Sequence, residues 1–396
     1  MEIKREEIKY VDNDPQKGII VDWAKVFKYY RDLKCPKNIY NPAKELPITK
    51  AEYFVLISTR STGKTTNLLL IGIILYLMYG IVTAYIRQTE RMIEKKNADK
   101  LFTTINAFKY IETLTNGEYN STYYFGRVCR FVHIDENGKI DKKSEPFLQA
   151  LAISNHEEYK STLNMPTGDF AIFDEFISTG YAQNEFVDFL DLLKTIFRDR
   201  LTCKIIMLAN TTDYYNEYLK ELLIQDEVLQ VKEDAPFEKL TPKGTRIFCH
   251  LIGNRNQSRA KVNTLYFGFN NSKIASITGG AWAVDCYPHI IKDKDREFIY
   301  KGQYLTFNGR YLNLELCASK DLGLHVLVHR ANRLPEKSDT RVYTVNNITR
   351  KNEFYKFGCK KIDKIYWALY NANKWYYNNN DEGYTVESYV SRASKL

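Results

Sequence analysis

The chain has 396 residues, of which 44% are hydrophobic and 27% charged, so it can form buried cores and lacks the composition of an unfolded chain. This length predicts two or three domains. The 57 basic and 48 acidic residues give a net charge of +9, which favours an anionic partner such as nucleic acid, although a merely basic soluble protein has the same balance.

The positions of the cysteines and the residues at the start of the given sequence indicate the kind of cellular compartment to expect. The seven cysteines are scattered, without a close pair or the spacing of metal ligands, so we expect free thiols in a reducing compartment. Residues 1–7 are charged and lack the apolar segment of a signal peptide. Residues 1–38 contain one short helical pattern, over 22–33, to which we assign no role.

The most informative stretch is residues 53–66. Residues 53–57 are apolar and predict a buried strand, a short polar loop follows, and a long apolar helical pattern starts after Gly63. This order predicts a phosphate-binding loop, because its backbone N–H groups and the helix N-terminus attract anionic phosphate. The candidate nucleotide-binding residues are Ser58, Thr59, Arg60, Ser61, Thr62, Gly63, Lys64, Thr65 and Thr66.

Two side chains of this loop are assigned chemical roles. Lys64 would contact the β- and γ-phosphates of ATP, and Thr65 would offer its hydroxyl to Mg²⁺. Ser58 stands where the pattern G-x-x-x-x-G-K-[ST] has its first glycine, so the pattern alone also fits a chance Gly-Lys-Thr. A partner motif on the same chain would decide between these interpretations.

Residues 68–86 are almost wholly apolar and long enough to cross a bilayer. Gly80 interrupts them, and glycine commonly ends a helix. We therefore predict a buried helix to about residue 79 and a buried strand over 81–86, rather than a membrane span.

Polar residues follow this predicted strand. Arg87 and Arg91 come at the edge where open α/β sheets bind ligands. Each is a candidate contact to nucleotide, to DNA or to a neighbouring subunit, and each is equally well explained as a solvated loop residue.

Residues 92–112 predict a helix, and the next segment predicts strands. Residues 125–134 and 139–151 flank Asn137-Gly138, a strong hairpin signal. We expect this hairpin to be an antiparallel insertion on an otherwise parallel sheet.

The partner motif lies at residues 169–176. Four apolar residues lead to Asp174 and Glu175, which is the form of a Walker B strand. Asp174 would hold Mg²⁺ beside the phosphates, and Glu175 would orient and deprotonate the attacking water. The pattern is weak alone, but it is specific after a phosphate-loop candidate on the same chain.

An amphipathic helix is predicted over residues 184–200, followed by a buried strand over 204–210. The residues of this helix expected in the core are Phe186, Leu190, Leu193 and Phe197. Arg198 and Arg200, at its end, either complement the helix dipole or reach the nucleotide of the next subunit. Asn210 ends the strand where P-loop ATPases place a group that senses the γ-phosphate.

These motifs, in this order, resemble a known family. The matching segments are residues 40–42, 58–65, 173–177, 195–200 and 208–210. They resemble the DNA encapsidation ATPases of small Picovirinae-type tailed phages, the smallest relatives of terminase large subunits. The resemblance covers residues 39–212 and, more weakly, 304–311. The N-terminal segment and the insertions have no counterpart in it.

The resemblance implies an α/β P-loop ATPase of the additional-strand (ASCE) class, with ATP and Mg²⁺ as cofactors. It implies a ring, commonly of five subunits, that drives double-stranded DNA into an empty prohead, with Arg198 acting on the neighbour's ATP. It also implies contact with the portal and, in some phages, with a structural RNA. The protein would then work in the host cytoplasm at the portal vertex, without a membrane and outside the mature virion.

The remaining chain is divided into a linker region over residues 216–290 and a strand-rich domain over 291–396, after an ATPase domain over 1–215. Strands are expected over 301–307, 310–318, 322–328 and 341–345, and a helix over 362–376. This pattern suits an RNase H-like α+β domain. Its basic residues suit either phosphate contact or a solvated face; they are Arg330, Arg333, Lys337, Arg341, Arg350, Lys351, Lys356, Lys360, Lys361 and Lys364.

We expect this domain to lack a nuclease site. A two-metal nuclease needs several converging carboxylates. The candidate acidic ligands in this domain and just before it are Asp285, Glu315, Asp321, Glu336, Asp339, Glu353 and Asp363. Only Glu315 lies well inside a predicted strand, whereas Asp321, Asp339 and Asp363 are expected to be solvated.

Two alternatives stay open: a full terminase large subunit with an active nuclease, and a non-packaging P-loop ATPase acting on nucleic acid.

Overall fold

The computed structural model consists of two compact units, which are described here separately. The described residues are 3–36, 39–46, 51–58, 62–165, 167–177, 185–198, 200–210, 216–230, 235–253, 287–290, 295–307, 309–334, 340–345, 348, 350–355 and 361–393. The first unit includes the described residues up to 253, and the second those from 287 onward.

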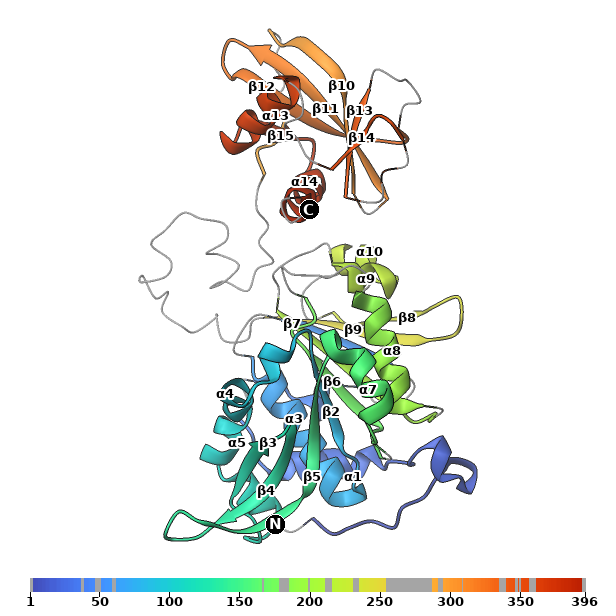
Figure 1. Ribbon diagram of the computed structural model, residues 1–396, viewed down its shortest axis with the longest axis vertical. Coiled ribbons are helices and arrows are strands. Elements are labelled where there is room, and N and C mark those ends of the chain that lie inside the picture. Colours follow the sequence, from blue (N-terminus) through green and yellow to red (C-terminus); the bar gives the residue numbers. More distant parts are fainter. Residues whose placement is uncertain are drawn as a thin grey trace. The chain divides into compact units, whose positions relative to one another are not determined.

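A nine-stranded sheet forms the centre of the first unit, in the order β3-β4-β5-β2-β6-β7-β1-β9-β8 (Figure 1). Its strands are β1 (Tyr53–Ser58), β2 (Thr83–Arg87), β3 (Ser121–Phe125), β4 (Val128–Ile134), β5 (Ile140–Ala152), β6 (Phe170–Asp174), β7 (Lys204–Asn210), β8 (Phe237–Leu240) and β9 (Arg246–Ile252). The six strands from β5 to β9 in this order are parallel, and antiparallel strands extend both ends. Because β7 lies between β1 and β6, the predicted additional-strand arrangement is confirmed.

Helices cover both faces of this sheet. They are α1 (Trp23–Asp32), α2 (Pro42–Glu45), α3 (Lys64–Tyr79), α4 (Lys95–Ala98), α5 (Thr103–Ala107), α6 (Tyr110–Leu114), α7 (His156–Thr162), α8 (Glu185–Phe197), α9 (Glu217–Glu221) and α10 (Gln225–Gln230). Side chains alternate along β1, so Phe54 and Leu56 pack into the core with α3, whereas Val55 and Ile57 pack into the core with α8. The fold is therefore an α/β sandwich with the sheet buried in the middle.

The apolar stretch 68–86 is divided as predicted. α3 ends at Gly80, which adopts the left-handed conformation with a φ of 72°, and β2 follows. Nearly all of α3 is buried under the sheet and α1, which accounts for its lack of a polar face. In the described part of the chain, no helix is both long and apolar enough to cross a membrane.

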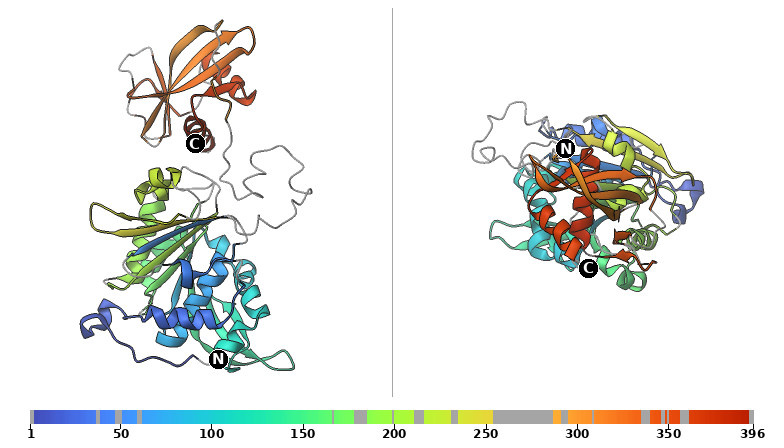
Figure 2. Two further views of the ribbon diagram at one scale, coloured as in Figure 1. Left: turned by 180° about the vertical axis from the view of Figure 1, so that it is seen from behind. Right: turned by 90° about the horizontal axis from the view of Figure 1, so that it is seen from above.

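The N-terminal segment lies against α3. The backbone N–H of Glu6 donates to the carbonyl of Met78 at 2.9 Å, and that of Asp22 donates to the hydroxyl of Tyr79 at 3.1 Å. α1, predicted over 22–33, packs on α3 on the same face of the sheet (Figure 2). This segment therefore completes the core on that face.

Two predictions within the first unit need correction. The single helix expected over 92–112 is a series of short helices, with Lys109 at a φ of 54° between α5 and α6. Leu190 on α8 is 40% exposed, because the buried stripe runs through Phe189 and Leu193 instead.

The expected linker region also needs correction. Residues 216–253 belong to the first unit, since β9 pairs with β1 along its whole length and α9 contributes Tyr218 and Leu219 to the core. The charged segment 226–244 contains part of α10 and all of β8. Residues 254–286 lie outside the described part.

The second unit is built on a six-stranded sheet in the order β14-β13-β10-β11-β12-β15. Its elements are β10 (Glu297–Phe307), β11 (Arg310–Ser319), β12 (Gly323–Ala331), β13 (Arg341–Thr344), β14 (Glu353–Phe354), α13 (Lys361–Asn371), β15 (Trp375–Tyr377) and α14 (Asn380–Ala393). An antiparallel meander, β10 to β12, is continued by parallel β13 and β14, which agrees with the predicted RNase H-like α+β domain. The helix expected over 362–376 ends at Asn371, and a strand follows it.

A buried ion pair in this unit overturns two expectations. Asp363, expected to be solvated, is fully buried on α13, and Arg341, expected in a basic face, is buried on β13. The Arg341 guanidinium donates to Asp363 Oδ2 at 3.0 Å, and the Tyr343 hydroxyl donates to Oδ1 at 2.5 Å. Arg341 also lies over the ring of Phe354, with 3.9 Å to the ring centroid. The pair joins the helix to the sheet and is not available to phosphate.

We therefore expect Arg341→Ala to lower the free energy of unfolding of this unit by about 3–5 kcal/mol, because it leaves the Asp363 carboxylate buried without its counter-ion. Guanidinium unfolding of the full chain, followed by tryptophan fluorescence, measures this change. The control is Lys364→Ala on the exposed face of α13, for which we expect a change within about 0.5 kcal/mol. A loss below about 1 kcal/mol for Arg341→Ala would contradict this role.

Candidate functional site

The candidate site lies where four parallel strands end together. Ser58 at the end of β1 is paired in register with Asn210 at the end of β7, and Asp174 at the end of β6 is paired with Leu208. β2 ends beside β6, at Arg87. In open α/β sheets this carboxyl edge binds ligands, so sequence-distant residues meet at the expected place.

The phosphate-loop candidate leads directly from β1 into α3. Gly63 has a φ of 76°, a left-handed conformation that glycine adopts without strain, and α3 begins at Lys64. The Lys64 ammonium donates to the hydroxyl of Ser58, whose oxygen lies 2.8 Å from that of Thr62. Thr59, Arg60 and Ser61 lie outside the described residues.

Lys64 is buried against the sheet. Desolvation lowers its pKa to about 8, and the negative charges of Asp174 and Glu175 oppose that shift. A desolvated cation at a helix N-terminus has a strong electrostatic interaction with any anion that reaches it. The position therefore suits phosphate.

Asp174 is the most enclosed carboxylate of the site. Its Oδ2 accepts hydrogen bonds from the hydroxyl of Thr65 at 3.2 Å and from that of Tyr85 at 2.8 Å. Burial raises the pKa of Asp174, and the positive charge of Arg87 opposes the shift. A carboxylate beside a threonine hydroxyl provides the hard oxygen ligands that Mg²⁺ prefers, so the two residues fit this ion.

Tyr85 was missed by the sequence reasoning. It is fully buried on β2, two residues before Arg87 and therefore on the same face. The sequence did contain a signal for Tyr85, because a tyrosine two residues before the polar end of a strand faces the same side as that end.

Arg87 pairs with both carboxylates of the Walker B motif. Its side chain is only 13% exposed, and its guanidinium lies 2.5 Å from Glu175 Oε2 and 3.5 Å from Asp174 Oδ2. Glu175 has a φ of 55°, and its side chain is 48% exposed. Arg87 is thus paired within its own subunit, whereas Arg91 is exposed on the 3-10 helix Glu90–Ile93. A contact of either arginine with nucleotide, DNA or a neighbouring subunit stays a prediction.

A second polar network supports the backbone after Glu175. The buried amide of Gln88 donates to the carbonyl of Phe176 at 3.2 Å and to Glu185 Oε1 at 3.1 Å. Tyr218 donates to the same Glu185 oxygen at 2.8 Å. The network links the ends of β2 and β6 to α8 and α9, and no sequence pattern identified it.

A cavity of about 590 Å³ opens at this edge. One end is polar and is lined by Thr62, Gly63, Lys64, Thr65, Asp174 and Asn210, together with Thr66, Asn67 and Glu175. Pockets of this size hold small ligands and cofactors. The arrangement can therefore hold a polyphosphate and a divalent cation beside one carboxylate that is partly free to solvent.

The two arginines after α8 lie elsewhere. β7 has seven residues and spans roughly 20 Å, and Arg198 lies near its amino end, whereas the cavity lies at its carboxyl end. Arg198 is exposed and cannot reach the cavity of its own chain. Arg200 is buried in an ion pair of 2.6 Å with Asp169, and its expected contact with a neighbouring subunit or DNA stays a prediction.

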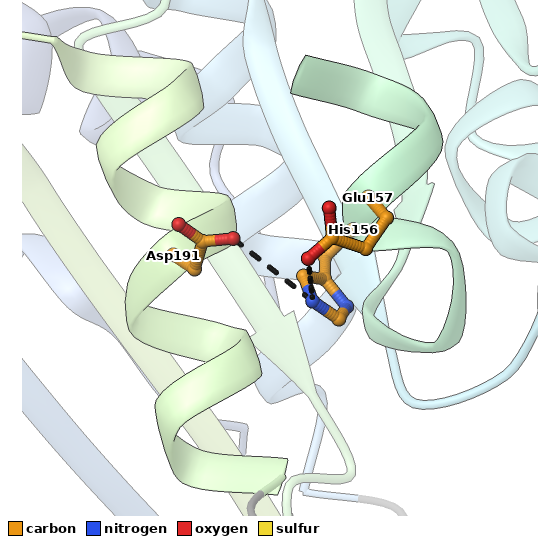
Figure 3. A group of neighbouring side chains, drawn as sticks. All are labelled: His156, Glu157 and Asp191. Atoms are coloured by element: carbon orange, nitrogen blue, oxygen red, sulfur yellow. Dashed lines mark ion pairs between the residues drawn. The ribbon is translucent and has the colours of Figure 1, made fainter.

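A second cluster of potential metal ligands lies between α7 and α8. Among the described residues, His156, Glu157 and Asp191 have ligand atoms within 4.8 Å of one another (Figure 3). The Lys160 ammonium lies 2.8 Å from Glu157 and 2.9 Å from Asp191, so both carboxylates already have a counter-ion. We interpret the cluster as an ion-pair contact between the two helices.

Comparison with known proteins found similar folds but no similar sequences. No protein-family model matches the chain, and no curated protein matches it. The Phi-28 gp11 DNA packaging motor is similar in structure, with 19% identity and a TM-score of 0.51, over 91% of this chain and 99% of that one.

Two further matches cover between half and two thirds of the chain. The N-terminal domain of the DNA packaging ATPase from bacteriophage phi29 has 21% identity and a TM-score of 0.42, over 55% of this chain and 98% of that one. The large terminase ATPase domain of Thermus phage P74-26 has 14% identity and a TM-score of 0.34, over 59% and 89%. The match to the Phi-28 gp11 motor shows that the chain has the fold of a phage DNA packaging motor over nearly its whole length.

Proposed function

We propose that this protein is the ATPase of a viral DNA packaging motor, hydrolysing ATP to move double-stranded DNA into a preformed prohead. One observation carries the proposal: Lys64 and Thr65 at the start of α3 meet Asp174 and Glu175 at a cavity next to the additional strand β7. The fold shared with a DNA packaging motor supports packaging among the activities of P-loop ATPases.

Different residues of the cavity have separate roles in ATP hydrolysis. Lys64 holds the β- and γ-phosphates, and Thr65 with Asp174 would hold Mg²⁺, which neutralises phosphate charge when bound. Glu175 orients the attacking water and accepts its proton, for which it must leave Arg87. Asn210, beside Ser58, is placed to sense the γ-phosphate.

We further propose a homomeric ring, commonly of five subunits, on the portal vertex in the host cytoplasm, with double-stranded DNA, the portal and in some phages a structural RNA as partners. The net charge of +9 supports an anionic partner. Because Arg198 lies at the edge of β7 opposite the cavity, a role in hydrolysis requires the nucleotide of a neighbouring subunit.

The second unit is proposed to contact nucleic acid or the portal without cutting DNA. Its buried carboxylates, among the described residues, are Asp363 and Glu382, and both are engaged. Asp363 pairs with Arg341, and Glu382 accepts three backbone N–H groups. Glu315 lies 3.4 Å from His329 and 3.6 Å from Lys301, and its pKa is lowered mainly by the hydrogen bond with His329. A full terminase with an active nuclease is therefore the less favoured alternative.

Packaging with purified proheads tests the proposal. We expect the protein, with Mg²⁺ and ATP, to protect prohead-filling DNA from added DNase, and the DNA to stay at its original length. Lys64→Ala should abolish protection and lower ATP turnover at least about 10²-fold, because Lys64 is the one cation among the described residues that line the cavity. Lys96→Ala, an exposed lysine on α4, is the control and should package normally. Normal turnover in Lys64→Ala would end the proposal, and metal-dependent cleavage lost in Glu315→Ala would favour the terminase alternative.

Asp174 and Glu175 should separate binding from hydrolysis. Asp174→Asn should weaken Mg-ATP binding, because the amide has no charge for the ion. Glu175→Gln should bind Mg-ATP normally but hydrolyse it about 10²- to 10⁴-fold more slowly, since an amide does not accept the water's proton. Calorimetric binding and single-turnover kinetics measure the two effects. Identical behaviour of the two variants would contradict this division.

Arg198 should act between subunits. An arginine supplied in trans accelerates P-loop hydrolysis about 10³- to 10⁵-fold. Neither Arg198→Ala nor Glu175→Gln rings should hydrolyse ATP, but mixed rings should recover activity where a Glu175→Gln subunit offers its arginine to an Arg198→Ala subunit. Arg31→Ala, an exposed arginine on α1 with no assigned role, is the control and should be active alone. Inactivity at every mixing ratio, in rings shown to be mixed, would assign Arg198 a structural role only.

A further inference from the structure

Part of the cavity lining, called the apolar end here, offers no charge to a polyphosphate. It consists of Pro36, Ile39, Phe108 and Tyr110, together with Thr104. Pockets that bind small ligands combine such an apolar part with a few polar groups. The apolar end therefore requires its own explanation.

Phe108 is the most unusual residue of this end. Its side chain is apolar and 58% exposed, yet its ring is stacked with that of Tyr110, with 5.7 Å between centroids and 20° between planes. Between them, Lys109 has a φ of 54°, a conformation that residues with a side chain rarely adopt. Backbone conformations of this kind persist where the surrounding structure requires them, often at ligand sites.

Tyr110 is anchored from beneath by the N-terminal segment. It is 8% exposed and belongs to the same core cluster as the buried Tyr30 of α1, against which Cys35 also packs. Pro36 follows Cys35 directly and lines the cavity. The aromatic side of the cavity and its N-terminal side are thus connected.

Ile39 is held close to the start of α3. A Cβ atom on Gly63 would lie 3.1 Å from the Cβ of Ile39, so the two backbones approach closely. Tyr40 donates its N–H to the carbonyl of Thr62 at 2.8 Å and accepts from the Asn67 amide at 2.7 Å. Ile39 is therefore fixed beside the start of α3, where the phosphate-binding loop ends.

We propose that this end binds the base of the nucleotide, with the exposed face of Phe108 stacked on a purine and Pro36 and Ile39 forming the apolar wall. The inference rests on the proposed ATPase function and names the residues that select the nucleoside. Stacking on an aromatic ring requires only a π-face, and purines offer the larger one. The N-terminal segment, which no resemblance explained, then forms part of the nucleotide site.

Calorimetry with the full-length protein separates base binding from phosphate binding. The probes are the non-hydrolysable β,γ-imido analogue of ATP and inorganic tripolyphosphate, both with Mg²⁺. We expect Phe108→Ala to weaken the ATP analogue about 5- to 150-fold, the range measured for base–aromatic stacking, and to leave tripolyphosphate binding unchanged. Phe108→Tyr, which keeps the ring, should bind both probes normally.

Phe125→Ala is the matched control, since Phe125 is 66% exposed but lies on the edge strand β3 and does not line the cavity. Unchanged affinity of Phe108→Ala for the ATP analogue would overturn the inference, and would make Phe108 a surface residue or a contact to another molecule. Equal weakening of both probes would also overturn it, because it would indicate a disturbed phosphate loop. Absence of binding of either probe to the unmodified protein would instead contradict the proposed function.

Discussion

Parallel pairing of β1, β7, β6 and β2 is the constraint on which the site depends. Parallel neighbours place their carboxyl ends at one edge, so Ser58, Asn210, Asp174 and Arg87 meet although they come from four separate segments. Thr65 and Asp174 are 109 residues apart in sequence and are joined by a hydrogen bond of 3.2 Å. The crossovers that parallel pairing needs are α3 and α8, which cover the two faces. Parallel strand pairing therefore determines both the sheet and the position of the site.

Charge balance explains the side chains that fill this edge. Lys64 and Arg87 are largely buried cations, and Asp174 and Glu175 are the carboxylates beside them. Burying such charges contributes little net stability, so the ion pairs are better understood as positioning devices. Arg87 pairs with both carboxylates and fixes their positions at the carboxyl edge of the sheet.

Several features followed from the sequence alone. The phosphate loop, the Walker B strand and the strand over 204–210 were all predicted, because apolar strands that end in polar residues are local patterns. The place of that strand between β1 and β6 was implied by the family resemblance. Gly80 separated α3 from β2 because a left-handed residue ends a helix whatever packs around it. Asn-Gly and its flanking alternation predicted the β4–β5 hairpin for the same local reason.

Tertiary structure alone decided which charged residues are partners. Arg87, Arg200, Arg341 and Asp363 look like solvated residues in the sequence, yet each is buried in an ion pair with a residue from a distant segment. It also decided that β9 extends the sheet beside β1 and that Phe108 and Pro36 line one cavity. These outcomes depend on contacts between segments brought together by the fold. A local pattern fixes periodicity and turns, but it contains no information on which distant side chain neutralises a charge.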